Sequence, residues 1–318
     1  QTILELSETT PFSFILVTHK SEALLADPTQ KSKILGRFNR PTRRIELPEN
    51  MAFKLMGAAM QKNKDEVLQE EWGNIIADLC ERTVESRKMV KNIAQIDDDT
   101  LQGVLPIHPY TACLLKHIST SFESNQRSMF DFIKNENGGE NKGFCWFIDN
   151  FGPYDENPLL TIDMLWGFFY DLGKDSLAQN IRMILDNYPR LSTTKKLTSE
   201  EERVLKTILL MQAMSLEVND AVDIFLATER NLSNAFEGSD LENEAISCAE
   251  KLVRDNIVYK KPMGSDKFVY SILTSELDST KINDSKKKFE STTTNSLISE
   301  GALREFIELT DAIKLRFK

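Results

Sequence analysis

Cysteine and histidine are scarce in this sequence, and no motif brings them together. Four cysteines and three histidines are spread along the chain, and they form neither a CxxC pair nor a Cys/His spacing typical of zinc ligands. The start of the chain also lacks the apolar stretch of a secretory signal. The cysteines, Cys80, Cys113, Cys145 and Cys248, are therefore predicted to be reduced core thiols of a cytoplasmic protein that holds no metal.

Long apolar runs and a surplus of basic residues are also absent. No apolar run approaches the length of a membrane span, which predicts a protein without a membrane partner. The chain has 39 lysines and arginines against 49 acidic residues, a net charge of −10. A protein that coats duplex DNA needs a basic surface to neutralise phosphates. The composition therefore gives DNA no support as a partner, although a local basic patch would still allow it.

The phosphate-binding loop of P-loop ATPases is missing as well. The sequence GxxxxGK[ST] does not occur. The nearest string runs from Gly167 to Asp175, but its glycines are one residue too far apart and Asp175 replaces the serine or threonine. No apolar strand ending in Asp-Glu precedes Phe12. Because hydrolysis needs both the loop and an acidic partner for Mg²⁺, we expect no ATPase activity and no cofactor for this chain alone.

Two short strand patterns lie near the beginning of the chain. Phe12–Val17 is almost entirely apolar, as is typical of a strand buried on both faces of a parallel sheet, and Arg43–Leu47 is a second candidate. The segment between them, Ser21–Leu35, is compatible with a helix. We interpret residues 1–60 as the last strands and helix of an α/β core whose earlier strands are expected to lie elsewhere.

Helical periodicity dominates the next part of the chain, residues 61–190. One long helix is predicted over Asp65–Val90, where apolar residues recur near helical spacing. Shorter helices are predicted over Glu49–Met60, Tyr110–Ile118, Ser128–Ile133, Leu160–Tyr170 and Ser176–Asn187. The polar, glycine-containing stretch Asn135–Lys142 is predicted to be a loop. We interpret residues 61–190 as a helical bundle.

A different pattern characterises residues 191–275. Thr198–Glu201 has the spacing of a capping box and predicts the start of a helix that continues to Met214. An amphipathic helix over Ala245–Asp255 is followed by two strand patterns around the turn Met263–Asp266, which together are typical of a winged helix. Residues 276–318 are interpreted as a polar linker and the start of a following element. The predicted fold class is thus mainly α, with an α/β remnant and a winged-helix-like α+β unit.

The segment Ile34–Leu47, ILGRFNRPTRRIEL, resembles the GRFDR segment of AAA+ ATPases. In that family the arginine reaches the γ-phosphate of the neighbouring subunit. The resemblance implies that Arg37 is an arginine finger, that Arg40 is the second arginine, and that His19, at the end of the preceding strand, is a sensor. Asn39 departs from the usual aspartate. The alternative is that Arg37 only caps a helix C-terminus.

A second stretch, Leu105–Thr111 followed by Ile118–Phe132, resembles the pattern PLHPxT…IS..F.QNERSLF of very large bacterial AAA+/STAND-like ATPases associated with phage-defence and DNA-modification islands. Thr198–Met211 and Glu300–Leu309 resemble further segments of those proteins in the same order. The resemblance implies that His108 and Pro109 begin a lid helix close to adenine and ribose, and that Arg127 is a sensor arginine. Alternatively, His-Pro is an ordinary helix start and Arg127 pairs with Glu123.

The resemblance implies the function of the whole chain. It would be the lid and nucleotide-sensing part of a P-loop ATPase in antiviral defence, using ATP and Mg²⁺ only together with the P-loop half. Its partners would be the rest of the ATPase, other protein subunits or further copies of itself. Two alternatives stay open: a non-catalytic helical adaptor or scaffold, and a winged-helix regulator that binds DNA. The segment Leu241–Ile272 carries five acidic and five basic residues, which favours a hinge over a DNA reader.

Overall fold

The structure, a computed structural model, describes residues 51–60, 63–118, 129–134, 142–194, 196–217, 223–263, 267–273 and 288. The chain divides into two compact units, Gln1–Met51 and Ala52–Lys318. Apart from Met51, the described residues belong to the second unit. The predicted strands Phe12–Val17 and Arg43–Leu47, the predicted loop Asn135–Lys142 except Lys142, and the segment 289–318 lie outside the described residues, so these predictions stay untested.

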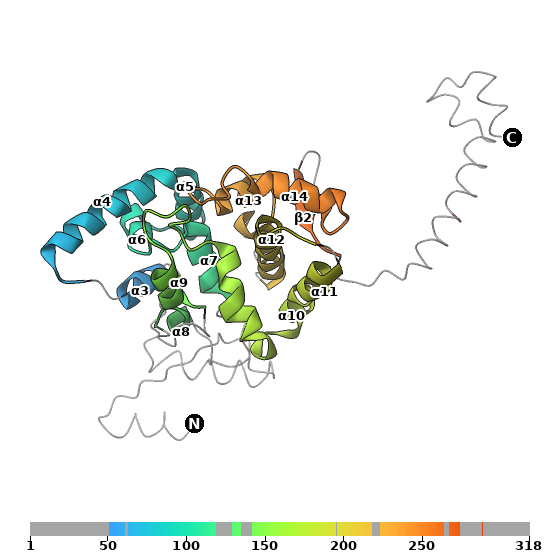
Figure 1. Cartoon of the computed structure of the whole chain (residues 1–318), viewed down its shortest axis with the longest axis horizontal. Coiled ribbons are helices and arrows are strands. Elements are labelled where there is room, and N and C mark those ends of the chain that lie inside the picture. The colour runs from blue at the N-terminus through green and yellow to red at the C-terminus, as the bar shows by residue number, and fades with distance from the viewer. Residues whose placement is uncertain are drawn as a thin grey trace, which may run out of the picture. The chain divides into compact units, whose positions relative to one another are not determined.

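Helices form most of the described part of the chain, which confirms the mainly α class (Figure 1). The first half contains α3 (Met51–Ala59), α4 (Glu66–Arg82), α5 (Val84–Ala94), α6 (Asp98–Gln102), α7 (Pro109–Ile118), α8 (Met129–Lys134) and α9 (Phe144–Asn150). The second half contains η3 (Ile162–Met164), η4 (Gly167–Asp171), η5 (Lys174–Ser176), α10 (Gln179–Leu185), α11 (Asn187–Thr194), α12 (Ser199–Glu217), η6 (Asp223–Phe225), α13 (Glu229–Ala235), α14 (Ala245–Arg254), β1 (Tyr259–Met263) and β2 (Lys267–Ser271). None of these helices combines the length and apolar character needed to cross a bilayer.

The single helix predicted over Asp65–Val90 is in fact two helices. Asp65 begins α4 by accepting hydrogen bonds from the backbone N–H groups of Val67 and Leu68. At Thr83 the backbone leaves the helical region, with φ −121° and ψ 37°, and α5 begins at the next residue. The Thr83 hydroxyl is buried and donates to the carbonyl of Leu79 over 2.7 Å. This bond satisfies the hydrogen-bonding capacity of the buried hydroxyl. The break between the two helices therefore lies at a buried residue, without a solvent-exposed loop.

The helix predicted over Leu160–Tyr170 is also corrected in part. Leu160 pairs in parallel with Ile107 in an isolated bridge. Its N–H donates to Pro106, and its carbonyl accepts from His108. These bonds hold Leu160 extended, so the helical turns begin only at Ile162, as a 3₁₀ turn followed by the π-helical η4. The helix predicted over Ser176–Asn187 likewise begins later, at Gln179.

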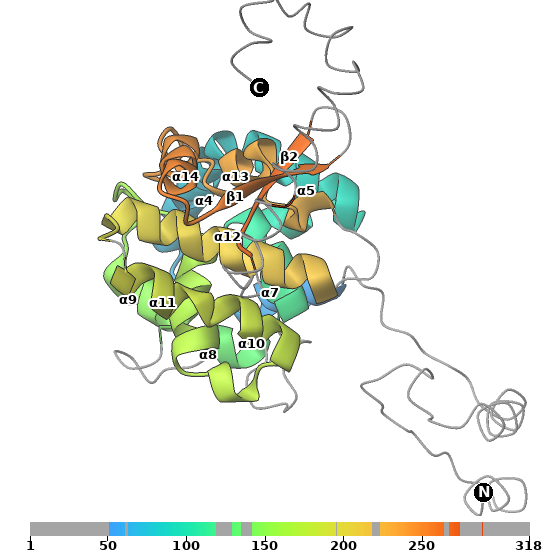
Figure 2. The same cartoon turned by 90° about the vertical axis from the view of Figure 1, so that its right-hand side faces the viewer.

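The core surrounds two central helices, α7 and α12. Most side chains of α7 are buried, and α12 packs against α10, α14 and η3. Figure 2 shows α12 between α14 and β1 on one side and α10 and α11 on the other. One continuous cluster of buried residues extends from Phe53 in α3 to Ile272 after β2. The predicted helical bundle and the predicted winged-helix-like unit therefore share one core.

The C-terminal elements of this unit have the predicted local structure. The capping box is formed: the Thr198 N–H donates to the Glu201 carboxylate over 3.1 Å, and the Glu201 N–H donates to the Thr198 hydroxyl over 3.3 Å. The strands β1 and β2 pair antiparallel, with Tyr259 opposite Ser271. On its other edge β2 makes a single backbone bond, from the Tyr270 N–H to the Ala227 carbonyl. The helices α12, α13 and α14 and a β-hairpin thus form one packed group.

Gly57 marks a close approach of backbones, and it allows a test of this packing. A Cβ atom at Gly57 would lie 2.7 Å from the carbonyl oxygen of Gly103, which follows α6. We expect Gly57→Ala to destabilise the protein by about 1–3 kcal/mol, because the backbone of Gly103 has to move. Urea denaturation measures the difference.

Gly73→Ala is the matched control. A Cβ atom at Gly73, in the middle of α4, would meet no atom within 4 Å. Alanine has the higher helix propensity, so this variant should gain about 0.5–1 kcal/mol. If both variants change stability in the same direction, helix propensity and not the contact with Gly103 governs position 57.

Candidate functional site

Of the predicted site residues, the described part of the chain contains His108 and Pro109. The other four, His19, Arg37, Arg40 and Arg127, lie outside it, so their predicted roles stay predictions. The candidate functional site is therefore built around the beginning of α7.

His108 is the residue from which α7 starts. Its ring Nδ1 accepts a hydrogen bond from the Tyr110 N–H over 3.2 Å, as an N-cap side chain does. Its carbonyl accepts from the Ala112 N–H, and Pro109 occupies the first helical position, where a missing N–H costs nothing. The side chain is fully buried. This geometry explains His-Pro as a helix start, whereas a contact with adenine stays a prediction.

The buried ring of His108 is neutral. Burial lowers the pKa of His108 to about 3, and only the backbone of Glu237 opposes this. Since Nδ1 accepts a hydrogen bond, the ring proton belongs on Nε2. Nε2 is buried, and the Glu237 backbone, the one group that favours a protonated ring, forms no well-aligned hydrogen bond with it. Protonation of the ring would place an uncompensated charge in the core, so His108 couples folding to pH.

This coupling predicts that the stability of the protein falls in mild acid. The unfolded chain binds a proton at His108 below a pKa of 6.5, while the folded chain does not until about 3. The stabilisation is thus complete above 6.5 and is lost as the pH falls toward 3. Between pH 7.5 and 5, His108 should account for a loss of about 2 kcal/mol in the free energy of unfolding. Urea denaturation at both pH values measures it.

The variant His108→Asn separates this effect from other titrations. Asparagine can cap the helix through its side-chain oxygen but does not titrate. Its stability should therefore change less between the two pH values, by the same amount of about 2 kcal/mol. Equal pH dependence in His108→Asn and the unmodified protein would contradict the assignment.

The start of α7 is bonded to α13, which belongs to the C-terminal group. The Tyr110 hydroxyl donates to the side-chain oxygen of Asn231, and Asn234 donates to that hydroxyl, both over 3.2 Å. Asn231 in turn donates to the carbonyls of Asp223 and Leu226. Burial, the largest influence, raises the pKa of Tyr110 to about 12. Tyr110 therefore remains neutral and links α7 to α13 through hydrogen bonds.

The loop after α13 supplies a second link. The Glu237 carboxylate accepts from the N–H groups of Glu85 and Ser86, over 3.0 and 2.6 Å, at the N-terminus of α5. Thr83, the N-cap residue of α5, makes no side-chain cap bond. A carboxylate is favoured there because the first N–H groups of a helix are unpaired and the helix dipole is positive. Next to it, Gly238 has φ +74°, and a Cβ atom at this position would lie only 2.9 Å from the Cβ of Arg82.

A third link joins α12 to η3 and to the loop after α13. Arg203 contacts Asp163 over 2.8 Å and Asp240 over 2.5 Å. Burial alone would lower the pKa of Arg203, but the two carboxylates hold it above its usual value. The second oxygen of Asp163 accepts from the Thr161 hydroxyl. We call His108, Tyr110, Glu237 and Arg203, with their partners, the junction.

Sequence reasoning found only part of the junction. His108 and Pro109 were singled out, but Glu237, Arg203 and Tyr110 were not. Glu237 lies about 150 positions from the helix that it caps, and Asp163 lies 40 positions from Arg203. Local patterns carry no signal for partners at such distances. The sequence carried no clue to this cap, because Asp65–Val90 was predicted as one continuous helix.

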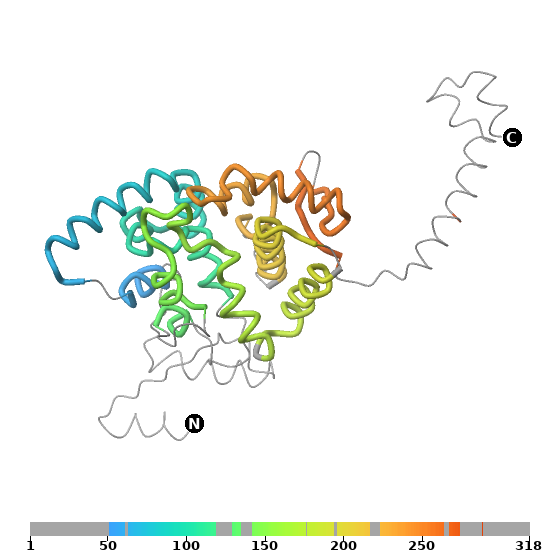
Figure 3. Tube along the Cα trace, in the orientation of Figure 1, coloured from blue at the N-terminus to red at the C-terminus, as the bar shows by residue number. Residues whose placement is uncertain are grey.

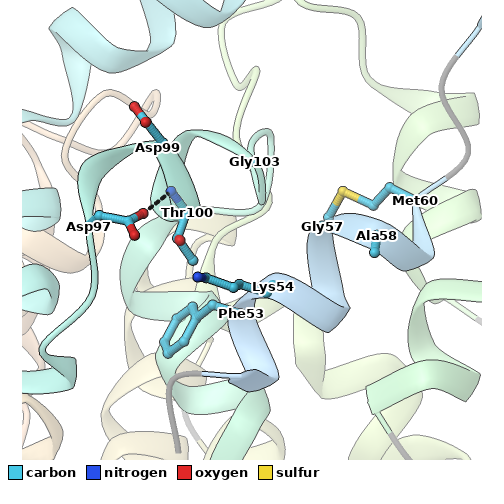
Figure 4. Close-up of a pocket in the computed structure, with 9 residues that line it drawn as sticks. All are labelled: Phe53, Lys54, Gly57, Ala58, Met60, Asp97, Asp99, Thr100 and Gly103. Carbon is cyan, nitrogen blue, oxygen red and sulfur yellow. Dashed lines mark hydrogen bonds between the residues drawn. The ribbon is translucent and has the colours of Figure 1, made fainter. Parts of the chain in front are cut away.

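A cavity of about 670 Å³ lies away from the junction, between α3 and α6 (Figure 4). Lys54 points toward Thr100 and Asp97 in it. The Asp97 carboxylate already accepts from the Thr100 N–H over 2.7 Å. With Asp99 also lining the cavity, carboxylates outnumber ammonium groups, which disfavours phosphates. In the described residues, no group of three or more His, Cys, Asp or Glu side chains could hold a metal ion.

No family model, curated protein or solved structure matches the chain.

Proposed function

We propose that this chain is the lid and nucleotide-sensing part of a AAA+/STAND-like ATPase, and that it converts the ATP state of a P-loop core into movement or assembly. The observation that carries the proposal is the placement of the His108–Pro109 start of α7. It is bonded through Tyr110 to α13, in the C-terminal group. In the proposed lid, a movement of α7 would be transmitted to the C-terminal group through this bond between Tyr110 and α13.

The C-terminal group supports the second element of the proposal, a winged helix. Its order is α12, α13, α14, β1, β2, and the Tyr270 N–H on the open edge of β2 donates to the carbonyl of Ala227, which precedes α13. Three helices with a hairpin at the C-terminal end are the elements of a winged helix. On α14, Ala249 and Leu252 are buried against the rest of the group. The apolar face of α14 is thus used for packing within the protein.

The continuous core indicates which parts move together. Because buried residues from Phe53 to Ile272 form one cluster, the lid and the winged helix act as a single lever. Rigid-body movement of such a lever is a common way to transmit a ligand state. The described residues offer no phosphate site. In the proposal, the residues that bind the nucleotide phosphates therefore belong to the P-loop half.

Charge pairing supports a lever over a reader of DNA. Two of the five basic residues in the segment Leu241–Ile272 are bonded to carboxylates of the same unit. Lys251 pairs with Glu201, and Lys260 pairs with Glu250 over 2.6 Å. These pairs reduce the positive charge that α14 and the hairpin can offer to DNA phosphates. Duplex DNA is therefore not proposed as a partner.

Calorimetry with Mg-ATP tests whether ATP binding requires the proposed P-loop half. The chain alone should bind Mg-ATP no more tightly than about 1 mM, and it should hydrolyse none. The coding sequence before Gln1 should contain a strand, GxxxxGK[ST] and a helix, and the longer protein should bind ATP at micromolar concentration. ATP should then change amide hydrogen exchange around residues 51–60. Micromolar binding by the chain alone, or an upstream sequence without that motif, would reject the proposal.

A further inference from the structure

The N-terminal half of α4 projects from the rest of the described unit (Figures 1 and 3). Residues 63–71 are all exposed, and Val67 and Leu68 have exposed fractions of 72% and 46%. Farther along the helix, Leu79 is buried with Leu105 and Leu159. One end of α4 is therefore anchored in a small apolar cluster, while the other end lies in solvent.

An apolar seam runs along this helix from the anchored end into solvent. Leu68, Trp72, Ile75 and Leu79 are spaced by four, three and four residues, which is the a/d spacing of a coiled coil. Leu68 is exposed, Ile75 and Trp72 are half-buried, and Leu79 is buried. From Leu68 to Leu79 the seam is about 16 Å long. Only its last residue is fully covered within the described part of the chain.

The charges beside the seam have one sign. Between Asp65 and Arg82 there are six acidic residues and one basic residue, Arg82, whose guanidinium is bonded to Asp78. With Trp72 at an a position, Glu71 and Asp78 occupy the flanking g positions, where charges select the partner of a coiled coil. In an antiparallel pair with a second copy of α4, Glu71 would face Asp78 of the other copy across the seam. The matching occupant is a helix with an apolar stripe and basic flanks.

We propose that α4 docks a basic amphipathic helix of a partner protein along the seam Leu68–Trp72–Ile75. The apolar stripe of the partner would cover the seam, and its lysines or arginines would face Glu71 and the other carboxylates of α4. This surface does not depend on the proposed ATPase function, because it uses neither the junction nor a nucleotide. Either proposal can fail without the other.

The probe is a labelled synthetic helix of three heptads with leucine at a and d and lysine at e and g. Fluorescence anisotropy with the full chain should give micromolar binding that weakens with added salt. A peptide with glutamate at e and g should bind at least about tenfold more weakly. A lysine peptide of the same composition in scrambled order should also bind at least about tenfold more weakly, since its leucines form no stripe.

Two neighbouring exposed residues provide a matched pair of variants. Leu68 lies on the seam, and Val67 lies about 100° away around the helix. Leu68→Gln should reduce affinity for the lysine peptide about tenfold, whereas Val67→Gln should leave it within about twofold. Circular dichroism should show equal helix content in both variants.

Three results would overturn the proposal. The first is equal binding of the lysine and scrambled peptides, which would indicate attraction to the acidic chain alone. The second is an equal effect of Leu68→Gln and Val67→Gln. The third is a dimer of the chain in sedimentation that Leu68→Gln dissolves, because the occupant would then be a second copy.

Discussion

If the proposed P-loop half is present, replacing Arg37 with alanine in the protein that contains it should lower ATP turnover about a hundredfold or more, with nucleotide binding nearly unchanged. A guanidinium that reaches the γ-phosphate of the neighbouring subunit acts mainly on the charge that develops in the transition state. Its loss therefore reduces kcat and leaves the ground-state complex largely intact. Steady-state ATP hydrolysis and calorimetric nucleotide titration measure the two quantities.

Arg43→Ala serves as the control for this prediction. Arg43 lies in the same basic segment but outside the GRFxR spacing that assigns Arg37 and Arg40. Its replacement should leave turnover within about twofold, because it has no assigned contact with phosphate. If Arg37→Ala keeps full turnover and only lowers the unfolding temperature, Arg37 is a helix cap and the finger assignment is wrong.

Arg203→Ala should destabilise the protein by about 3–5 kcal/mol. The variant leaves Asp163 without its cationic partner, and the Asp163 side chain is only 5% exposed. Removal of one member of a buried pair is costly because the remaining charge has no solvation. Asp240, which is more exposed, can recover contact with water. Urea denaturation of the chain measures the loss.

Arg82→Ala provides the comparison, because the same kind of pair is exposed there. Arg82 also contacts a carboxylate, that of Asp78, over 2.8 Å, but the two side chains are 48% and 54% exposed. This variant should cost no more than about 1 kcal/mol, since solvent screens the pair. Alanine keeps the Cβ atom that packs against Gly238. Similar losses in both variants would mean that the Arg203 pairs contribute no more than a surface ion pair.

Local sequence signals were sufficient for many of the helices and for the hairpin. The capping box at Thr198 and Glu201, the amphipathic helix α14 and the two strands after it depend on neighbours within a few residues. Their hydrogen bonds and apolar spacing therefore involve residues that lie only a few positions apart in the sequence. The start of α7 at His108 and Pro109 belongs to the same class.

Other features were fixed by partners that are distant in the sequence. The extended backbone at Leu160 and the cap that Glu237 provides for α5 each require a contact with another element. Hydrophobic spacing cannot reveal such contacts, because it reports which face of an element is apolar and not what covers that face. The same limit applies to α4, whose apolar spacing predicted a helix but did not show that its outer half is exposed.

Composition and local spacing thus accounted for a mainly helical protein with a terminal hairpin, since helix propensity, capping and alternation act over a few residues. Packing accounted for the rest. It joined the predicted bundle and the C-terminal group in one core, buried the neutral ring of His108 between them and paired Arg203 with two carboxylates. Burial and charge pairing depend on the position of every neighbouring element in space, and residues that are far apart in the sequence acquire those positions only when the chain folds.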